Sequence, residues 1–436
     1  MIRVAMIGAG SVGFTRRLLM DLLAVPEFRD TEFRLMDISG ENLEMATNLC
    51  RKMVADNNLP AKVTGTLDRK EALRGADYVI STVRVGGLEA FAHDVEIPLK
   101  YGVDQCVGDT LGPGGIFYAL RTIPVLLDVA KDMREVCPDA LLLNYSNPMA
   151  MNCWAVRRAG GIRMVGLCHG VQHGAHQIAN ALGIPAGEME YICAGINHQT
   201  WFTKIMHKGK DLTDQVLPAM KREYANSEPV RIDVLERFGY YSTESNGHLS
   251  EYLPWYRKRP SEIERWIDPS VWVGGETGGY LRVCRESRDD YTKNYPKWLS
   301  GELDQIALGS RSNEHGSWII EALETGRRYW GCMNVANTGL ITNLPDGCTV
   351  ELPCIVDSNG IQPTYVGDLP MQCAAVCRAS VSVQEMTVQA ALTGDKQLVR
   401  LAVLNDPLTA AVCTPDEVWK MCDEMFEALG PWMPEF

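Results

Sequence analysis

The chain lacks long apolar runs and is short of positive charge. No apolar run in its 436 residues approaches the roughly 20 residues that a membrane-spanning helix needs, and it shows no signal peptide, internal repeat or low-complexity segment. The 42 Lys and Arg against 55 Asp and Glu leave a net charge of −13, which argues against nucleic acid or an anionic membrane as a partner. We therefore expect a cytoplasmic protein that acts on a small molecule.

A disulfide framework is absent as well. The 14 cysteines are scattered among strand-like and helix-like segments, without the dense, even spacing of small secreted domains. We expect them to be reduced, as in a cytoplasmic protein. The chain is too long for one ordinary core, which predicts two domains, residues 1–195 and 196–436.

The most informative segment that is present is IRVAMIGAGSVG, near the N-terminus. Gly8, Gly10 and Gly13 have G-x-G-x-x-G spacing after an apolar run. In dinucleotide-binding folds the first glycine allows a tight turn, the second admits the pyrophosphate, and the third lets a helix pack on the strand. Asp37 ends the next apolar run, about 20 residues on, where an acid accepts the ribose hydroxyls. With Ser11, these are the predicted cofactor-binding residues, and the absence of a basic neighbour beside Asp37 favours NAD over NADP.

About the first 170 residues alternate apolar runs with helical patterns, which predicts a Rossmann-like, doubly wound parallel sheet. Helical spacing occurs at residues 41–57 and 117–136. From about residue 196 the pattern becomes mixed, and Asp-Gly and Asn-Gly turns late in the chain predict strands, so we expect an α+β C-terminal domain. The predicted strands of the first half are Arg3 to Ile7, Phe33 to Met36, Tyr78 to Thr82, Ala140 to Asn144 and Met164 to Leu167.

Polar clusters follow several of these strands, where a doubly wound sheet binds its ligands. Asn147 follows one strand, Cys168 and His169 follow another, and the segment AGINH places His198 after a further apolar stretch. A thiol and an imidazole at the mouth of a nucleotide fold suggest a divalent metal with open coordination positions. A buried structural cysteine is the common alternative, and the spacing of the pair does not decide between the two.

Several segments together resemble glycoside hydrolase family 4, whose members depend on NAD and a divalent metal. The resemblance covers essentially the whole chain, and the α-galactosidase (melibiase) branch is the most similar. It implies a lactate/malate dehydrogenase-like fold and hydrolysis by oxidation, elimination, addition and reduction with NAD and Mn²⁺. It also implies a homodimer or homotetramer. The segments are IGAGS, DTLGPGGI, LLNYSNPMAMN, GLCHGVQ, AGINH, TES followed by HLSEYLPW, and NLPDGCTVELPCIVDSNGIQPTYVG.

The resemblance also implies roles for individual residues. Cys168 and His198 match the metal ligands, and Tyr252 matches the base that removes the proton at C2 of the sugar. Asp109 and His169 are the two candidates for assisting departure of the aglycone. A packing role for Tyr252 and a loop-capping role for Asp109 are the structural alternatives.

Substrate preference is left open by three positions. Gly170 stands where the α-galactosidases carry Ser, and Gly108 gives the Val-Gly-Asp-Thr spelling of the α-galacturonidases. Arg84 stands where galactosidases tend to carry Gln, and its guanidinium can pair with a substrate carboxylate, with the NAD pyrophosphate or with solvent. Asn147 matches a residue at the sugar and nicotinamide. We expect an α-galactoside as substrate, with an α-galacturonide or α-glucuronide as the alternative.

Two functions of other classes are also compatible with the nucleotide motif. One is an NAD-dependent hydroxy acid dehydrogenase, which needs a His–Asp pair and a carboxylate-binding Arg but no metal. The other is a non-catalytic NAD-binding regulator. The Cys168 and His198 pair, together with Tyr252, argues against both.

Overall fold

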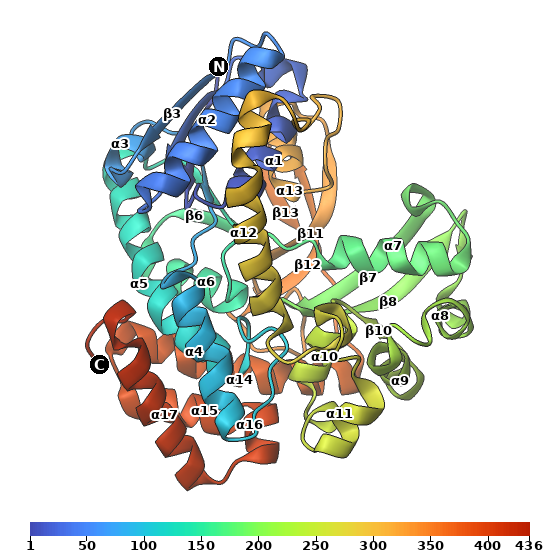
Figure 1. The fold of residues 1–436 in the computed structure, drawn as a ribbon. Helices are drawn as coiled ribbons and strands as arrows, with labels where there is room; N and C mark the ends of the chain where they lie inside the picture. Colours follow the sequence, from blue (N-terminus) through green and yellow to red (C-terminus); the bar gives the residue numbers. More distant parts are fainter.

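The computed structural model describes residues 1–436, and one mixed sheet of 13 strands organises them (Figure 1). The strands are β1 Arg3–Ile7, β2 Glu32–Met36, β3 Lys62–Thr66, β4 Tyr78–Ser81, β5 Leu141–Asn144, β6 Arg163–Gly166, β7 Met189–Ile196, β8 Gln199–His207, β9 Lys210–Asp211, β10 Tyr241–Ser242, β11 Tyr329–Ala336, β12 Thr349–Asp357 and β13 Gly360–Pro363. Their order is β10-β8-β7-β12-β11-β6-β5-β4-β1-β2-β3, with β13 beside β12 and β9 beside β8.

The first half of the chain forms the parallel part of this sheet, in the order β3-β2-β1-β4-β5-β6. This is the strand order of dinucleotide-binding domains, so the predicted fold class is confirmed. All five predicted strands are present, each within one residue of its expected bounds. The edge strand β3 was not predicted, because its sequence KVTGT offers only Val63 as a buried apolar residue.

The second half continues the sheet with antiparallel strands. Strand β11 joins β6 through one residue pair, Asn334 with Gly166, and β12 joins β7 through another, Glu351 with Gly195. Asn334 also lies opposite Glu351. These four residues form a row across the sheet, which we call the central row. The domain boundary expected at residue 195 falls within β7, and it stays a prediction.

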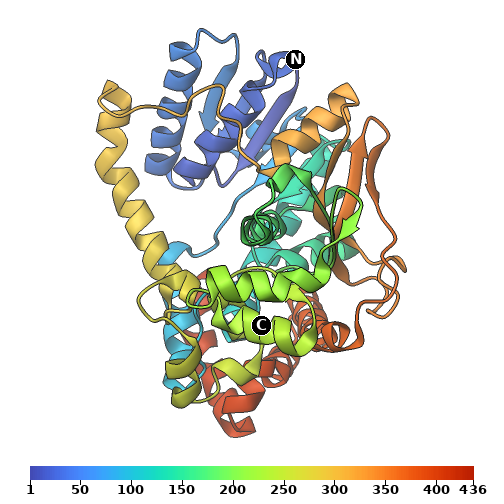
Figure 2. The ribbon, with the colours of Figure 1, turned by 90° about the vertical axis from the view of Figure 1, so that its right-hand side faces the viewer.

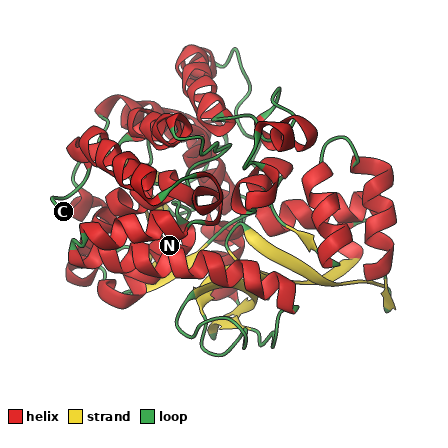
Figure 3. Ribbon diagram, turned by 90° about the horizontal axis from the view of Figure 1, so that it is seen from below, coloured by secondary structure: helices red, strands yellow, loops and turns green.

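Helices cover the sheet and build the lower part of the molecule, where the C-terminal helices pack against α4 and α5 (Figures 1 and 3). The helices predicted at 41–57 and 117–136 correspond to α2 and α5. The helices are α1 Val12–Leu23, α2 Gly40–Asp56, α3 Arg69–Leu73, α4 Gly87–Lys100, α5 Gly112–Val136, α6 Met149–Ala155, α7 Gly170–Leu182, α8 Val216–Tyr224, α9 Pro229–Phe238, α10 Asn246–Tyr252, α11 Pro260–Trp266, α12 Gly279–Ser300, α13 His315–Thr325, α14 Met371–Thr393, α15 Lys396–Asn405, α16 Pro407–Val412 and α17 Pro415–Leu429.

The two halves share their largest apolar core. Met6 and Leu143 from the first half belong to the same buried cluster as Leu249, Met333 and Val381 from the second. All 14 cysteines are free, as the sequence predicted. None of the helices combines the length and the apolar character needed to cross a membrane.

Helix α12 connects the two halves along the outside of the molecule (Figure 2). It begins beside α4 and ends on the outer side of α1 and α2. Its aromatic residues Tyr291, Tyr295 and Trp298 pack on a small buried cluster of the nucleotide-binding half that includes Val12 and Leu49. The helix therefore holds a segment of the second half against the first strand–helix turn.

A buried ion pair connects α4 to α5. Asp94 and Arg121 are each 1% exposed, and the guanidinium donates two hydrogen bonds to the carboxylate, at 2.9 and 2.6 Å. Removing one partner leaves the other charge buried and unpaired, which costs about 3–5 kcal/mol.

We therefore expect Arg121→Met to lower the free energy of unfolding by about 3–5 kcal/mol in urea titrations, and Arg121→Met with Asp94→Leu to recover most of the loss. Lys70→Met, which removes a solvent-exposed pair with Glu135, serves as the control and should cost about 1 kcal/mol or less. An Arg121→Met protein as stable as the control would show that the pair does not hold the helices together.

Candidate functional site

The glycine loop lies at the carboxyl ends of β1, β2 and β4. Gly8 has a φ of +87°, and a Cβ there would meet the backbone of Thr82 at 2.8 Å. The amide of Gly10 donates to Oδ2 of Asp37 at 2.7 Å, and a Cβ on Gly10 would meet that carboxylate. Ser11 precedes α1 and its hydroxyl makes no capping hydrogen bond. Of the six residues predicted to bind the cofactor, Gly8, Gly10 and Ser11 therefore form one loop with open backbone, and Asp37 contacts it.

The third glycine, Gly13, also lies against a distant helix. The nearest atoms to a Cβ on Gly13 would be those of the Tyr291 hydroxyl and ring, from α12, and not those of the strand. Gly13 is thus needed because α12 crosses the first turn of α1, an arrangement that the local motif does not encode.

The structure brings Cys168, His198 and Glu244 together. Cys168 follows β6, His198 lies in the turn between β7 and β8, and Glu244 follows β10. One ligand atom from each lies within 4.8 Å of the others, and Sγ of Cys168 is 3.6 Å from Oε1 of Glu244. Burial, and then the Glu244 carboxylate, raise the pKa of the Cys168 thiol well above its ordinary value, so a bound cation must displace the thiol proton. We call these three residues the trio.

His198 is held in a tight hairpin turn. Asn197 and His198 form the two-residue connection between the paired residues Ile196 and Gln199, and His198 has a φ of +61°. A non-glycine residue in this left-handed region costs about 1–2 kcal/mol, and such strain clusters at functional sites. The turn directs the imidazole toward Cys168 and Glu244.

Thr110 determines which nitrogen of His198 is available. Its hydroxyl donates to Oδ1 of Asp109 at 2.8 Å and lies 2.9 Å from Nδ1 of His198. Because the hydroxyl proton is directed to Asp109, the hydroxyl accepts from Nδ1–H. The other nitrogen, Nε2, is then unprotonated and can bind a cation.

Asp109 is the point where several predicted residues meet. It is 1% exposed and accepts hydrogen bonds from Nη2 of Arg84 at 3.2 Å and from Nδ2 of Asn147 at 3.3 Å to both oxygens. The Arg84 guanidinium also lies over the rings of Phe91 and Tyr118, 4.4 and 5.3 Å from their centroids. Arg84 is thus already paired with a carboxylate of the protein, and Asp109 does more than cap its loop.

Tyr252 lies at the end of α10 with its hydroxyl buried and without a hydrogen-bond partner. Burial raises the pKa of its phenol well above 10, and the nearby carboxylates of Glu251 and Asp109 add to the effect. Its aromatic neighbour is His248, whose pKa burial lowers to about 4. A buried polar atom without a partner is uncommon and calls for a ligand or a functional role.

His169 differs from the other predicted residues. Although it directly follows Cys168, its side chain is 66% exposed, and its Nδ1 lies 3.5 Å from Glu314. It precedes α7 and takes no part in the trio.

Sequence reasoning did not find Glu244. The acid was visible within the segment TES, but 76 positions separate it from Cys168. Nothing in the local pattern indicates that β10 returns beside β8, which is what brings Glu244 to His198.

The central row lies close to the trio along the sheet, since Gly166 and Gly195 come two and three residues before Cys168 and His198. Its two side chains, Asn334 and Glu351, are polar. Asn197 donates to Oε2 of Glu351 at 3.1 Å, while Oε1 of Glu351, Oδ1 of Asn197 and both polar side-chain atoms of Asn334 have no partner. Burial raises the pKa of Glu351 to about 8. The carboxyl is therefore mostly protonated at neutral pH, which avoids a buried unpaired charge.

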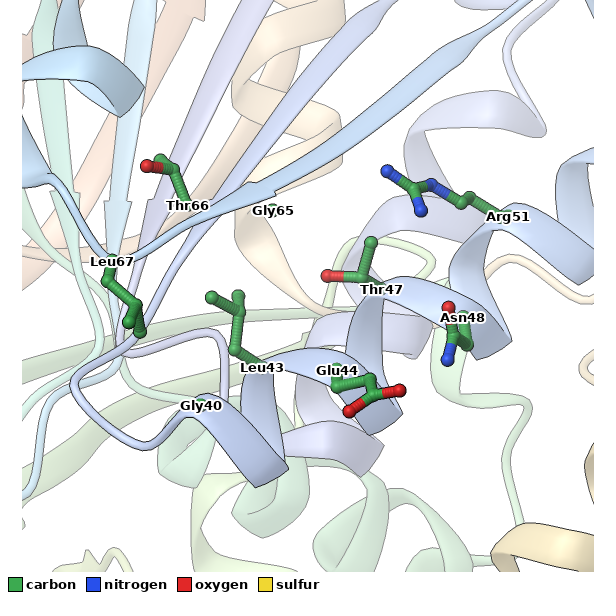
Figure 4. A pocket seen from close by; sticks show the side chains of 9 residues that line it. All are labelled: Gly40, Leu43, Glu44, Thr47, Asn48, Arg51, Gly65, Thr66 and Leu67. Atoms are coloured by element: carbon green, nitrogen blue, oxygen red, sulfur yellow. The ribbon is translucent and has the colours of Figure 1, made fainter.

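The residues of the trio fit a divalent cation. They combine a thiol, an imidazole with a free nitrogen and a carboxylate in a mostly buried position, and such donors bind Mn²⁺ or Zn²⁺. A surface groove of about 320 Å³ between α2 and β3 is a separate feature. None of the candidate residues lines that groove, whose lining side chains are shown in Figure 4.

The pKa of Glu351 gives a prediction about stability. An unfolded chain ionises this carboxyl near 4.5 and the folded chain near 8, so the free energy of unfolding falls as pH rises between these values. Glu351→Gln removes this titration. We expect the variant to gain stability relative to the natural protein by about 1.4 kcal/mol per pH unit across the window, in urea titrations of metal-free protein.

The exposed residue Glu385 provides the control, since Glu385→Gln should show no such trend. A stability difference between Glu351→Gln and the natural protein that stays constant with pH would contradict the buried, protonated state of Glu351.

Two family models cover most of the chain. The model described as family 4 glycosyl hydrolase matches residues 3–184, and the family 4 glycosyl hydrolase C-terminal domain matches residues 193–409.

Whole-length relatives agree with these matches. The chain is 56% identical to an α-galactosidase of Rhizobium meliloti, over 100% of this chain and 89% of the relative, and 39% identical to an α-galactosidase of Bacillus subtilis, over 100% and 99%. It is 30% identical to an α-galacturonidase of Thermoanaerobacterium saccharolyticum, over 98% and 95%.

Among solved structures, the 6-phospho-β-glucosidase of Thermotoga maritima with manganese, NAD⁺ and glucose 6-phosphate has a TM-score of 0.82. It is 25% identical in sequence and is covered, like this chain, over its full length. The family models, the relatives and the fold all agree: the chain belongs to the family 4 glycosyl hydrolases.

Proposed function

We propose that this glycosyl hydrolase cleaves α-galactosides with the help of NAD and a divalent metal, Mn²⁺ in the first instance. The observation that carries the proposal is the 56% identity, over the whole chain, to an α-galactosidase. Both family models describe glycosyl hydrolases, and they do not support the alternative functions of a hydroxy acid dehydrogenase or a non-catalytic NAD-binding regulator. Assembly into a homodimer or homotetramer stays a prediction of the resemblance.

The cofactors are inferred from the donor sets and from the manganese and NAD⁺ of the Thermotoga maritima enzyme. Cys168, as thiolate, and Nε2 of His198 would hold the metal. Gly8, Gly10, Ser11 and Asp37 would hold the dinucleotide, with Gly13 making room for α12. When bound, NAD supplies a hydride acceptor and the metal a Lewis acid that makes the C2 proton of the oxidised sugar more acidic.

Tyr252 is the proposed base at C2. Its hydroxyl is buried and unpartnered, so it is free to meet a sugar proton. The raised pKa of its phenol means that it works as a base only with a cation nearby, and the trio is the place for one. Asn147, bonded to Asp109, is proposed to orient the sugar and the nicotinamide.

Departure of the aglycone needs a proton donor. Asp109 is buried and all of its hydrogen-bond partners are donors, as an ionised carboxylate requires. His169 is exposed beside Cys168 and lies close to Glu314. These positions favour His169 as the proton donor to the departing aglycone. Asp109 is instead proposed to orient the side chains that donate to it, those of Thr110, Asn147 and Arg84.

The pairing of Arg84 favours a neutral galactoside over a uronide. A uronide carboxylate would have to compete with Asp109 for the Arg84 guanidinium. That guanidinium also lies over the rings of Phe91 and Tyr118. The α-galacturonidase of Thermoanaerobacterium saccharolyticum is also the more distant relative, at 30% identity against 56%.

We therefore expect nitrophenol release from the p-nitrophenyl α-galactoside and little from the corresponding α-galacturonide. Each would be assayed with NAD⁺, Mn²⁺ and a thiol reductant, and omission of NAD⁺ or of the metal should abolish release. No net NADH should accumulate, because the cofactor is recycled. Preference for the galacturonide would assign Arg84 to a substrate carboxylate and reverse the substrate proposal.

Two substitutions test the site. Tyr252→Phe should lower kcat by about 10²–10⁴-fold and slow the exchange of the C2 proton with deuterated solvent, because it removes the base. Cys168→Ser should abolish metal-dependent turnover.

The matched controls are Tyr256→Phe, whose hydroxyl donates to Asp233, and Cys413→Ser, which lies between α16 and α17. Both control proteins should retain turnover. Normal exchange at C2 in Tyr252→Phe would remove Tyr252 from the mechanism.

A further inference from the structure

We propose that Glu244 is a third protein ligand of the divalent metal and that Gly170 is the residue that makes room for it. The inference rests on the proposed function, because it needs a metal bound to Cys168 and His198.

The first observation is the position of the carboxylate. Oε1 of Glu244 is 3.6 Å from Sγ of Cys168, and the ligand atoms of the trio all lie within 4.8 Å of one another. An ion about 2.0–2.3 Å from each of its ligand atoms holds neighbouring ligand atoms about 3–4 Å apart. Small side-chain rotations therefore suffice for one ion to contact all three residues.

The second observation is the state of Glu244 in the protein. The carboxylate takes part in no ion pair, and its hydrogen-bond donor is the Cys168 thiol. That thiol becomes a thiolate when it binds a metal, so the contact turns into a repulsion between two anions. A shared cation removes this repulsion by placing a positive charge between the two anions.

The third observation is Gly170. A Cβ at this first residue of α7 would overlap the Glu244 carboxylate, and the amide of Gly170 lies 3.4 Å from the Cys168 sulfur. The absence of a side chain is thus what admits the acid. A side chain as small as that of serine would displace the Glu244 carboxylate in the same way.

The backbone at Glu244 is anchored next to His198. Thr243 donates its amide to the carbonyl of Thr200 at 3.0 Å, and its hydroxyl lies 2.7 Å from the Thr200 hydroxyl. Thr200 is two residues past His198 on β8. The backbone segments that bear Glu244 and His198 are therefore hydrogen-bonded to each other.

Three ligands give a different site from two. A thiolate and a carboxylate would neutralise the charge of a divalent ion, and its remaining coordination positions would be open to sugar oxygens and water. A carboxylate also shifts preference toward Mn²⁺, whereas a thiol and an imidazole alone suit softer ions. The ion should therefore stay bound in the absence of substrate.

The test is titration of Mn²⁺ into metal-free, full-length protein by calorimetry, without substrate. Glu244→Gln should weaken Mn²⁺ binding by about 10–100-fold. Gly170→Ala should weaken it as well, because the methyl group displaces the carboxylate. The double variant should bind no more weakly than the weaker single variant, since both changes remove the same contact.

Gly40→Ala is the matched control for the glycine. Gly40 is also the first residue of a helix, and a Cβ there meets nothing within 4 Å, so Mn²⁺ affinity should not change. The dissociation constant for NAD⁺, measured on every variant, reports whether the fold is intact, and it should be the same throughout.

The outcomes are distinct. Unchanged Mn²⁺ affinity in Glu244→Gln would overturn the proposal, and so would a raised KM with unchanged affinity, which would place Glu244 on the sugar. Additive losses in the double variant would separate Gly170 from Glu244 and overturn the coupling. A natural protein that binds no Mn²⁺ would instead contradict the proposed function.

Discussion

The site depends on the central row, where single residue pairs join β11 to β6 and β12 to β7. Gly166 lies two residues before Cys168, and Gly195 lies three residues before His198. The pairing of these glycines with Asn334 and Glu351 therefore fixes the positions of both proposed metal ligands. Asn334 packs closely against Gly166, since a Cβ on Gly166 would lie only 2.9 Å from the Cβ of Asn334. Cys168 and His198, which follow different strands, are thereby brought to the same edge of the sheet.

A polar interior supports this junction. Mostly protonated Glu351 accepts a hydrogen bond from Asn197, the residue before His198. Asp109 accepts hydrogen bonds from Arg84, Asn147 and Thr110. Asp109 and Thr110 fix the tautomer of His198, while the hairpin turn fixes its direction. The orientation of His198, a proposed metal ligand, is thus set by neighbouring residues.

The nucleotide-binding half follows closely from local sequence. Strands β1, β4 and β5 are short, buried apolar runs, so their position depends little on distant residues. The turn at Gly8 and the contact of Asp37 with Gly10 follow from spacing. Strand β3 was missed because an edge strand with one buried apolar residue carries little pattern. The packing of Tyr291 beside Gly13 was not predicted because Tyr291 comes from a distant helix.

The sequence by itself determined the parallel nucleotide fold and the family resemblance, and it singled out Cys168 and His198 as candidate metal ligands, because glycine spacing, apolar runs and short motifs are local properties. Only the tertiary structure decided that Cys168, His198 and Glu244 meet and that Arg84 pairs with Asp109. It also decided that Gly170 leaves space for an acid. These features arise from three separate strand ends converging at one sheet edge, a geometry set by long-range pairing and side-chain packing that no local pattern encodes.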